Sequence, residues 1–195
     1  MARSGPRAAA AGNVRIIGGR WRGRRLRFPQ RSGLRPTGDR LRETLFNWLQ
    51  PHWAGANCLD LFAGSGALGF EAASRGARRA TLIERDPEAV RALRENCTAL
   101  QAGAEIEIIG ADSLAWLAEP RDWDPYDVAF VDPPFAAEQL AATLQLLEAS
   151  RRLAAGAWIY VETARDRPLP AVPAAWVRHR ELVAGNVRCL LFRRI

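Results

Sequence analysis

The fold of this chain is decided by the stretch Asp60-Leu61-Phe62-Ala63-Gly64-Ser65-Gly66-Ala67-Leu68-Gly69. An apolar run that begins at Cys58 precedes the glycines and predicts a buried strand, and a helical pattern resumes at Leu68. A strand, a glycine loop and a helix in this order form a ligand cradle, because glycines allow a sharp turn and the helix start offers free N–H groups. The glycines satisfy G-x-G-x-x-G, a moderately specific pattern shared with dinucleotide-binding proteins.

An acidic residue inside the apolar strand narrows this interpretation. Asp60 lies four residues before Gly64. A strand that is only buried has no use for a carboxylate, whereas a cofactor with an amino group or a cationic centre does. The predicted cofactor-binding residues of this segment are Asp60, Phe62, Ala63, Gly64, Ser65 and Gly66.

The composition is that of one globular α/β domain with a short appendage. The chain has 195 residues, of which 48% are apolar and 25% are charged. All 28 basic residues are arginines, and 12 of them lie in the first 50 residues beside only two acids, Asp39 and Glu43. A basic arm on a nearly neutral body is typical of proteins that bind nucleic acid or an anionic membrane.

The cysteine content and the hydropathy of the chain indicate where in the cell the protein is expected. Three widely spaced cysteines and two histidines indicate neither a disulfide framework nor a metal site, so we predict no metal and a reducing, cytoplasmic location. No apolar run is long enough to span a membrane. Residues 1–12 are interpreted as a disordered leader, with an organellar presequence as the less favoured alternative.

Residues 13–35 form the predicted basic arm, in which residues 13–28 predict a β-hairpin with arginine on at least one face. Basic side chains around an aromatic residue suit phosphate contacts and base stacking on RNA. A solvated edge hairpin that arginines keep soluble is the alternative. The predicted RNA-binding residues are Arg20, Trp21, Arg22, Arg24, Arg25 and Arg27.

Residues 36–195 are predicted to form the main domain, which begins with a helix from Asp39 to Leu49 that Thr37 or Asp39 can cap. Its apolar residues share one face, which leaves Thr37 and Arg40 to face elsewhere. The segment is either a docking helix with a polar outer side or a cover over the carboxylate end of a cofactor. In the second case Thr37 and Arg40 bind the cofactor.

Two further acidic residues follow predicted strands. Glu84 lies 20 residues after Gly64, the spacing at which an acid accepts ribose hydroxyls, although it can also be an ordinary loop carboxylate. Asp112 follows the third strand and either caps the next helix or reaches an adenine amino group. Their neighbours Arg85 and Ser113 complete the predicted cofactor site.

The tetrad Asp132-Pro133-Pro134-Phe135 directly follows the predicted strand 126–131. A carboxylate at the carboxyl end of a central parallel strand lies at the crevice where such sheets bind ligands. The prolines make the next turn rigid, so that the aromatic ring projects at a fixed place; an Asx-Pro turn with a core Phe is the alternative. These four residues are the catalytic candidates.

Along the whole domain, predicted strands and helices alternate and then end in an antiparallel hairpin. This order predicts an α/β fold with a mostly parallel sheet.

These motifs resemble those of the S-adenosylmethionine-dependent amino methyltransferases. The tetrad alone is shared with DNA amino methyltransferases. From Val14 onward the chain is more closely similar to the bacterial methyltransferases that modify N2 of a guanine in 16S rRNA. The segments that carry this closer resemblance are Val14-Arg15-Ile16-Ile17-Gly18-Gly19, Gly33-Leu34-Arg35-Pro36-Thr37 and Arg42-Glu43-Thr44-Leu45-Phe46-Asn47-Trp48-Leu49.

The resemblance implies a Rossmann-like fold with a mostly parallel seven-stranded sheet, and S-adenosyl-L-methionine as cofactor. Residues 64–66 would lie against its methionine part, Asp60 near its amino group, Glu84 on the ribose and Asp112 on the adenine. Residues 35–47 would help to hold the methionine carboxylate. The implied partner is 16S rRNA, which we expect to be recognised within an assembled or partly assembled 30S subunit by a monomer.

The guanine amino group is a poor nucleophile, because its lone pair is delocalised into the ring. The Asp132 carboxylate and the Pro133 carbonyl would accept its N–H bonds, and Phe135 would stack on the base once it is turned out of the RNA. Three rivals stand beside this function. They are an amino methyltransferase acting on DNA or protein glutamine, an NAD-dependent oxidoreductase and a non-catalytic RNA-binding assembly factor.

Overall fold

The computed structural model describes residues 11–29, 38–120, 124–134 and 137–195. Its helices are α1 (Asp39–Trp48), the short 3-10 helix η1 (Gln50–His52), α2 (Ala67–Ser74), α3 (Pro87–Leu100), α4 (Ser113–Ala118) and α5 (Ala137–Ala149). Its strands are β1 (Ala11–Arg15), β2 (Arg25–Pro29), β3 (Asn57–Asp60), β4 (Arg79–Glu84), β5 (Ile106–Gly110), β6 (Tyr126–Val131), β7 (Leu153–Ala164), β8 (Trp176–Ala184) and β9 (Val187–Arg194).

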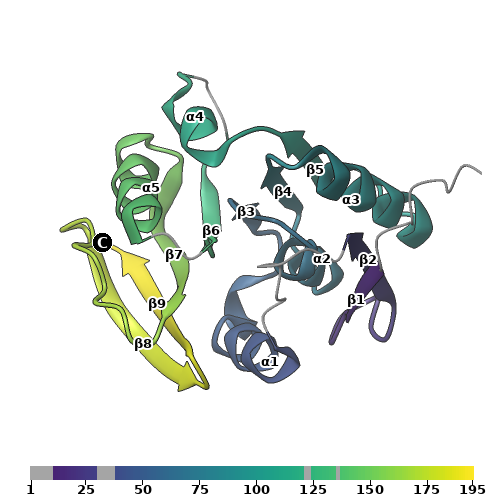
Figure 1. The fold of residues 1–195 in the computed structure, drawn as a ribbon, viewed down its shortest axis with the longest axis horizontal. Helices are drawn as coiled ribbons and strands as arrows, with labels where there is room; N and C mark the ends of the chain where they lie inside the picture. The colour runs from purple at the N-terminus through teal and green to yellow at the C-terminus, as the bar shows by residue number, and fades with distance from the viewer. Residues whose placement is uncertain (1–10, 30–37, 121–123, 135–136) are drawn as a thin grey trace, which may run out of the picture.

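The main sheet has seven strands in the order β5-β4-β3-β6-β7-β9-β8, as Figure 1 shows. Strands β3 to β7 are parallel, and β9 and β8 add an antiparallel hairpin at one edge. The chain moves outward from β3 to β5 and then crosses back to β6, so the strand order reverses between β3 and β6. Open α/β sheets bind ligands at the carboxyl ends of the strands at such a point. The predicted Rossmann-like α/β fold is confirmed.

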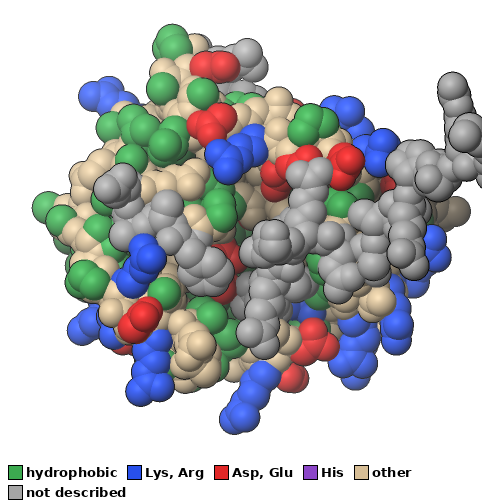
Figure 2. Space-filling model, viewed as in Figure 1, with side chains coloured by type: hydrophobic (Ala, Val, Ile, Leu, Met, Phe, Trp, Pro, Cys, Tyr) green, Lys and Arg blue, Asp and Glu red, His purple; other side chains and the backbone are tan. Residues whose placement is uncertain are grey.

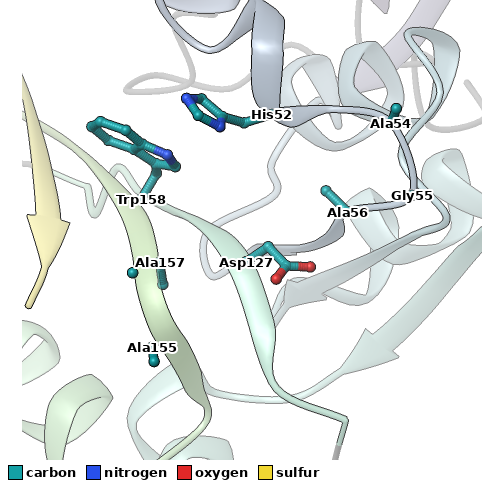
Figure 3. Close-up of a pocket in the computed structure, with 9 residues that line it drawn as sticks. His52, Ala54, Gly55, Ala56, Asp127, Ala155, Ala157 and Trp158 are labelled. Atoms are coloured by element: carbon teal, nitrogen blue, oxygen red, sulfur yellow. The ribbon is translucent and has the colours of Figure 1, made fainter.

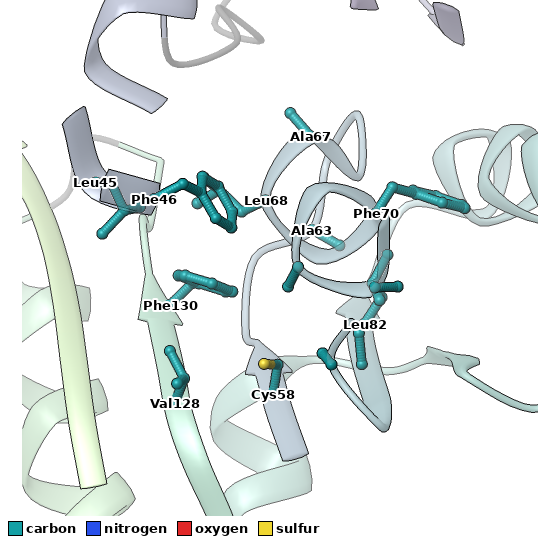
Figure 4. Close-up of a cluster of buried hydrophobic side chains, with 14 of the residues drawn as sticks. Leu45, Phe46, Cys58, Ala63, Ala67, Leu68, Phe70, Leu82, Val128 and Phe130 are labelled. Atoms are coloured by element: carbon teal, nitrogen blue, oxygen red, sulfur yellow. The ribbon is translucent and has the colours of Figure 1, made fainter. Parts of the chain in front are cut away.

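Two buried clusters lie on opposite faces of this sheet. Helices α1, α2 and α3 cover one face, and α4 and α5 cover the other. Figure 4 shows the first cluster, in which Phe46 of α1 packs against Phe130 of β6 with ring centroids 6.1 Å apart. A Cβ atom at Gly69 would lie 2.7 Å from Leu82, so this glycine lets α2 approach β4 closely. The tight packing of α2 fixes the glycine loop that precedes it.

The N-terminal hairpin of β1 and β2 packs against this same face rather than extending into solvent. Along β2, Arg25 and Arg27 are exposed while Leu26 and Phe28 are buried, which confirms an arginine-bearing outer face. The buried hairpin side chains belong to the same cluster as α2 and α3. The fully buried Glu71 of α2 accepts the backbone N–H groups that follow β1, from residues 17 and 18, at 2.7 and 2.8 Å.

The loop between β1 and β2 makes equally close contact with the end of α2. The N–H of Arg20 donates to the Ser74 carbonyl at 2.8 Å, and the N–H of Trp21 donates to the Ser74 hydroxyl at 2.9 Å. Gly19 has φ of 73°, and a Cβ there would lie 1.8 Å from the Ser74 carbonyl oxygen. Only glycine fits this contact without a shift of the backbone.

The start of α1 and the start of the hairpin differ from the sequence predictions. Asp39 does not cap the helix, because Gly38 is its N-cap and makes no side-chain cap bond; Asp39 instead accepts a bond from Arg42 at 2.7 Å. The other predicted cap, Thr37, lies outside the described residues. The hairpin begins at Ala11, two residues inside the predicted leader. In the part of the chain that the structure describes, no helix is long and apolar enough to cross a membrane.

Candidate cofactor and catalytic site

The glycine loop forms a tight turn between β3 and α2. Gly64 and Gly66 have φ of 51° and 77°, a region that side chains with a Cβ rarely adopt. The N–H of Ala63 donates to the Ile83 carbonyl of β4 at 3.0 Å, so the loop is anchored to the neighbouring strand. Ser65 is buried and Phe62 is half-buried. Gly66 is the N-cap of α2 and has no side chain to cap it.

Asp60 supplies the cap that the glycine cannot. Its buried carboxylate accepts the N–H of Gly69, in the first turn of α2, at 3.1 Å. The expectation that a buried strand has no structural use for this acid is therefore wrong. Burial nevertheless raises the pKa of Asp60 to about 7, with smaller contributions from the carboxylates of Glu84 and Glu162, although the N–H groups of Gly69 and Phe62 oppose the rise. A cationic ligand group beside Asp60 would favour its ionised form.

Glu84 joins the end of β4 to the glycine loop. One carboxylate oxygen accepts the N–H of Gly64 at 2.8 Å, and the other accepts the N–H of Asp86 at 2.8 Å. Each oxygen of a carboxylate can accept a second bond, and Glu84 is partly exposed. Glu84 therefore has a structural role in the loop and keeps the capacity to accept ribose hydroxyls.

Asp112 caps α4, as one of the two interpretations of the sequence predicted. It accepts the N–H groups of Leu114 and Ala115 at 3.0 and 3.1 Å. Its other oxygen lies 3.9 Å from the Arg85 guanidinium, and both side chains are exposed. The buried Ser113 hydroxyl donates to the carbonyl of Leu61, so its hydrogen is already used inside the fold.

Asp132 lies at the crevice on the strand next to Asp60. Asp60 pairs with Phe130 across β3 and β6, and Asp132 directly follows the last residue of β6, two residues after Phe130. Desolvation by the surrounding protein raises the pKa of Asp132 well above its usual range, and the carboxyls of Glu162 and Asp60 raise it further. Pro133 is buried and Pro134 is exposed.

Three other predicted residues have no described role at this centre. Phe135 and Thr37 lie outside the described residues. Arg40 is exposed on the first turn of α1, and no hydrogen bond or ion pair joins its side chain to another described residue.

Sequence reasoning missed Glu162, a buried acid at the carboxyl end of β7. It carries the same signal that identified Asp60, because it directly follows the apolar residues 157–161. Its negative charge contributes to the raised pKa of Asp132, so Glu162 belongs to the same group of acids.

The hairpin carries the candidate RNA interface. Arginine side chains gather over β1 and β2 at the lower right of Figure 2. All five arginines are exposed: Arg20, Arg22, Arg24, Arg25 and Arg27. Arg20 also forms an ion pair with Glu105, and Arg24 donates to the Ala99 carbonyl.

Trp21 does not belong to this outer surface, so its predicted role in base stacking is wrong. Its ring is buried against Phe70 of α2, with centroids 6.3 Å apart. The hairpin uses its one aromatic loop residue to dock onto the domain. What the hairpin presents outward is charge.

A cavity of about 350 Å³ lies at the opposite, amino end of the strands. Figure 3 shows Asp127 of β6 beside it, with the His52 and Trp158 rings side by side at its margin. Of the predicted cofactor, catalytic and RNA-binding residues that the structure describes, none lines this cavity. The crevice at Asp60 and Asp132 is therefore a separate site.

Several known proteins are similar to this chain over most of its length. A model of the family described as conserved hypothetical protein 95 matches residues 14–193. The chain is 49% identical to the ribosomal RNA small subunit methyltransferase D of Escherichia coli strain K12, over 97% of this chain and 94% of that protein. It is 44% identical to the Haemophilus influenzae protein of the same name, over 94% and 95% of the two chains. The solved structure of the putative methyltransferase yhhF from Escherichia coli superposes with a TM-score of 0.85 and 50% identity, covering 94% of this chain and 98% of that one.

Proposed function

This chain belongs to the ribosomal RNA small subunit methyltransferase D family, and from that premise we propose that it methylates the exocyclic N2 of a guanine in 16S rRNA, with S-adenosyl-L-methionine as methyl donor. One observation supports this proposal above the others. Asp60 and Asp132 approach the same crevice from adjacent strands, at the point where the strand order reverses and next to the glycine loop.

The residues around the loop fit this cofactor. Asp60 offers a buried carboxylate to an amino group, and Glu84 offers carboxylate oxygens at the end of β4 to ribose hydroxyls. The Asp112 carboxylate, which is exposed, would accept an adenine amino group. When bound, S-adenosylmethionine supplies an electrophilic methyl group attached to a sulfonium.

The tetrad would prepare the guanine amine for attack. The Asp132 carboxylate and the Pro133 carbonyl accept its two N–H bonds, which aims the nitrogen lone pair at the methyl group. Burial of Pro133 supports a rigid position for its carbonyl. Phe135 stacks on the base, which must leave its RNA context to reach the crevice.

The exposed arginines of the hairpin would hold the RNA near this crevice. A chain of this size with one short basic hairpin has little surface with which to distinguish one guanine among many. We therefore include the assembled or partly assembled 30S subunit in the proposal, with ribosomal proteins supplying part of the specificity to a monomeric enzyme. The compartment of such a substrate is the cytoplasm.

The test measures methyl transfer from radiolabelled S-adenosylmethionine to four substrates in parallel: free 16S rRNA, 30S subunits lacking the mark, DNA and protein. We expect label on 30S subunits, recovered as N2-methylguanosine by mass spectrometry. Asp132→Asn should abolish transfer and leave cofactor affinity within about threefold. Asp124→Asn, at an exposed acid before β6, is the matched control and should keep full activity. Label in DNA or protein, or full turnover by Asp132→Asn, contradicts the proposal.

A further inference from the structure

Three acids lie at the carboxyl ends of three adjacent strands; Asp60 and Glu162 are buried, and Asp132 is half-buried. Asp60 of β3 pairs with Phe130 of β6, and Phe130 pairs with Tyr160 of β7. Because side chains alternate along a strand, Asp132 and Glu162, two residues after Phe130 and Tyr160, project from the same face as those rings. The last pair of this register joins Val131 to Val161, so Asp132 and Glu162 each directly follow a residue of that pair.

Glu162 is held in place by a buried network. The Tyr160 hydroxyl donates to a Glu162 carboxylate oxygen at 2.8 Å and lies 3.1 Å from the Cys189 thiol of β9. Burial, the Glu162 carboxylate and Cys189 raise the pKa of Tyr160 well above its usual range, so the hydroxyl keeps its proton and remains a donor. A hydrogen bond donated to a carboxylate favours its ionised form. Tyr160 therefore stabilises a negative charge on Glu162.

We propose that Glu162 is a positioning residue that makes Asp132 the proton acceptor of the reaction, by placing a buried carboxylate beside it. This inference rests on the proposed function. It assigns a role to an acid outside the tetrad and the glycine loop.

Methyl transfer to an amine has to dispose of one proton. The nitrogen lone pair forms the new N–C bond, the C–S bond breaks with its electron pair on sulfur, and one N–H proton leaves the nitrogen. An ordinary aspartate is a weak base for this proton. Like charge from Glu162 makes Asp132 more basic and favours transfer of the proton to Asp132, from which it passes to solvent.

The groups that face Asp132 set the direction of the pH dependence. Among the described residues they are Glu162 with Tyr160 on β7, Asp60 on β3 and Cys189 on β9. Burial and the two acids all raise the pKa of Asp132, and Asp132 must be ionised to accept the proton. The rate therefore rises with pH through the pKa of Asp132. Removal of the Glu162 charge moves this rise to lower pH and lowers the rate on the plateau.

The test is the pH profile of single-turnover methylation of 30S subunits by the full chain. Glu162→Gln should shift the acid limb to lower pH and reduce the plateau rate about tenfold, a part of the roughly 10²- to 10⁴-fold effect of a general base. Affinity for S-adenosylmethionine should stay within about threefold. Glu162→Asp should restore the limb toward the wild-type position. Glu95→Gln, at an exposed acid of α3, should leave the profile unchanged.

Tyr160→Phe keeps the inference testable if Glu162→Gln does not fold. It removes only the hydroxyl, and it should shift the limb in the same direction by a smaller amount. An unchanged limb in the folded variants overturns the inference while the proposed function stands, because the wild-type enzyme still methylates the subunit. Absence of wild-type methylation on every substrate overturns the proposed function itself.

Discussion

Glu71 of α2 accepts the backbone N–H of Ile17 at 2.7 Å, so the helix that follows the glycine loop also holds the N-terminal hairpin. The same buried carboxylate accepts bonds from the N–H of Gly18 and from Arg75. The fully buried Arg42 of α1 lies 3.7 Å away and donates to the Arg15 carbonyl. The hairpin, α1 and α2 therefore all contact the carboxylate of Glu71.

Glu71→Ala should destabilise the protein by about 3–5 kcal/mol, because it leaves the N–H groups of residues 17 and 18 without their acceptor and removes an ion-pair partner of the buried Arg42. Urea unfolding followed by circular dichroism measures this change. Glu95→Ala, on an exposed surface of α3, is the control and should change stability by less than about 0.5 kcal/mol. A loss below about 1 kcal/mol at Glu71 would show that the junction contributes little to stability.

Two glycines in the hairpin loop give a matched pair of substitutions. Both have positive φ, 73° at Gly19 and 83° at Gly23, so alanine at either site costs roughly 1–2 kcal/mol of backbone strain. Only at Gly19 would an added Cβ also meet the Ser74 carbonyl oxygen, at 1.8 Å, while nothing lies within 4 Å at Gly23. Gly19→Ala should therefore undock the loop from α2.

Hydrogen exchange at the amides of Arg20 and Trp21 reports this undocking directly, because both donate to Ser74. Exchange should accelerate in Gly19→Ala and stay near the wild-type rate in Gly23→Ala. Equal protection in the two variants would mean that the loop backbone adapts to the added methyl group.

The sequence predicted the sheet and the acids at its strand ends, because periodicity and spacing are local signals. It could not predict which way the Trp21 ring points, since a hairpin residue between arginines has no local reason to be buried; the partner that buries it, Phe70, is distant in the chain. The burial of Arg42, the one arginine of α1 that is fully buried, could not be predicted either, because all basic residues of the chain are arginines. Glu162 was predictable in principle from the same pattern as Asp60.

The exposed hairpin arginines should determine the salt dependence of RNA binding. Each neutralised phosphate contributes roughly −0.7 to the slope of log K against log salt on single-stranded RNA. Replacement of Arg22, Arg25 and Arg27 by glutamine should flatten the slope by about 2 in a fluorescence anisotropy titration. Replacement of Arg178 and Arg180, exposed on β8 at the far edge of the sheet, is the control for loss of surface charge. Equal slopes for the two variants would remove the hairpin from the RNA interface.

Cofactor binding should be linked to the ionisation of Asp60. Its pKa is raised to about 7 in the folded protein, from 3.8, so Asp60 holds a proton between about pH 4 and pH 7 that the unfolded chain has lost. Protonation of Asp60 therefore contributes to the free energy of unfolding below about pH 4, and this contribution is lost as pH rises to about 7. A cationic amino group beside Asp60 would lower the pKa that burial raises, because it stabilises the ionised carboxylate.

S-adenosylmethionine binding should therefore release a proton at about pH 6 and weaken by up to about tenfold for each pH unit below about 7. Isothermal titration calorimetry at this pH, in two buffers of different ionisation enthalpy, measures the released proton directly. Asp60→Asn keeps an oxygen that can accept the N–H of Gly69, so the cap of α2 survives while the titration is lost. This variant should bind the cofactor more weakly at about pH 8 and show no dependence on the buffer. Proton release that persists in Asp60→Asn would assign the linkage to another acid of the crevice.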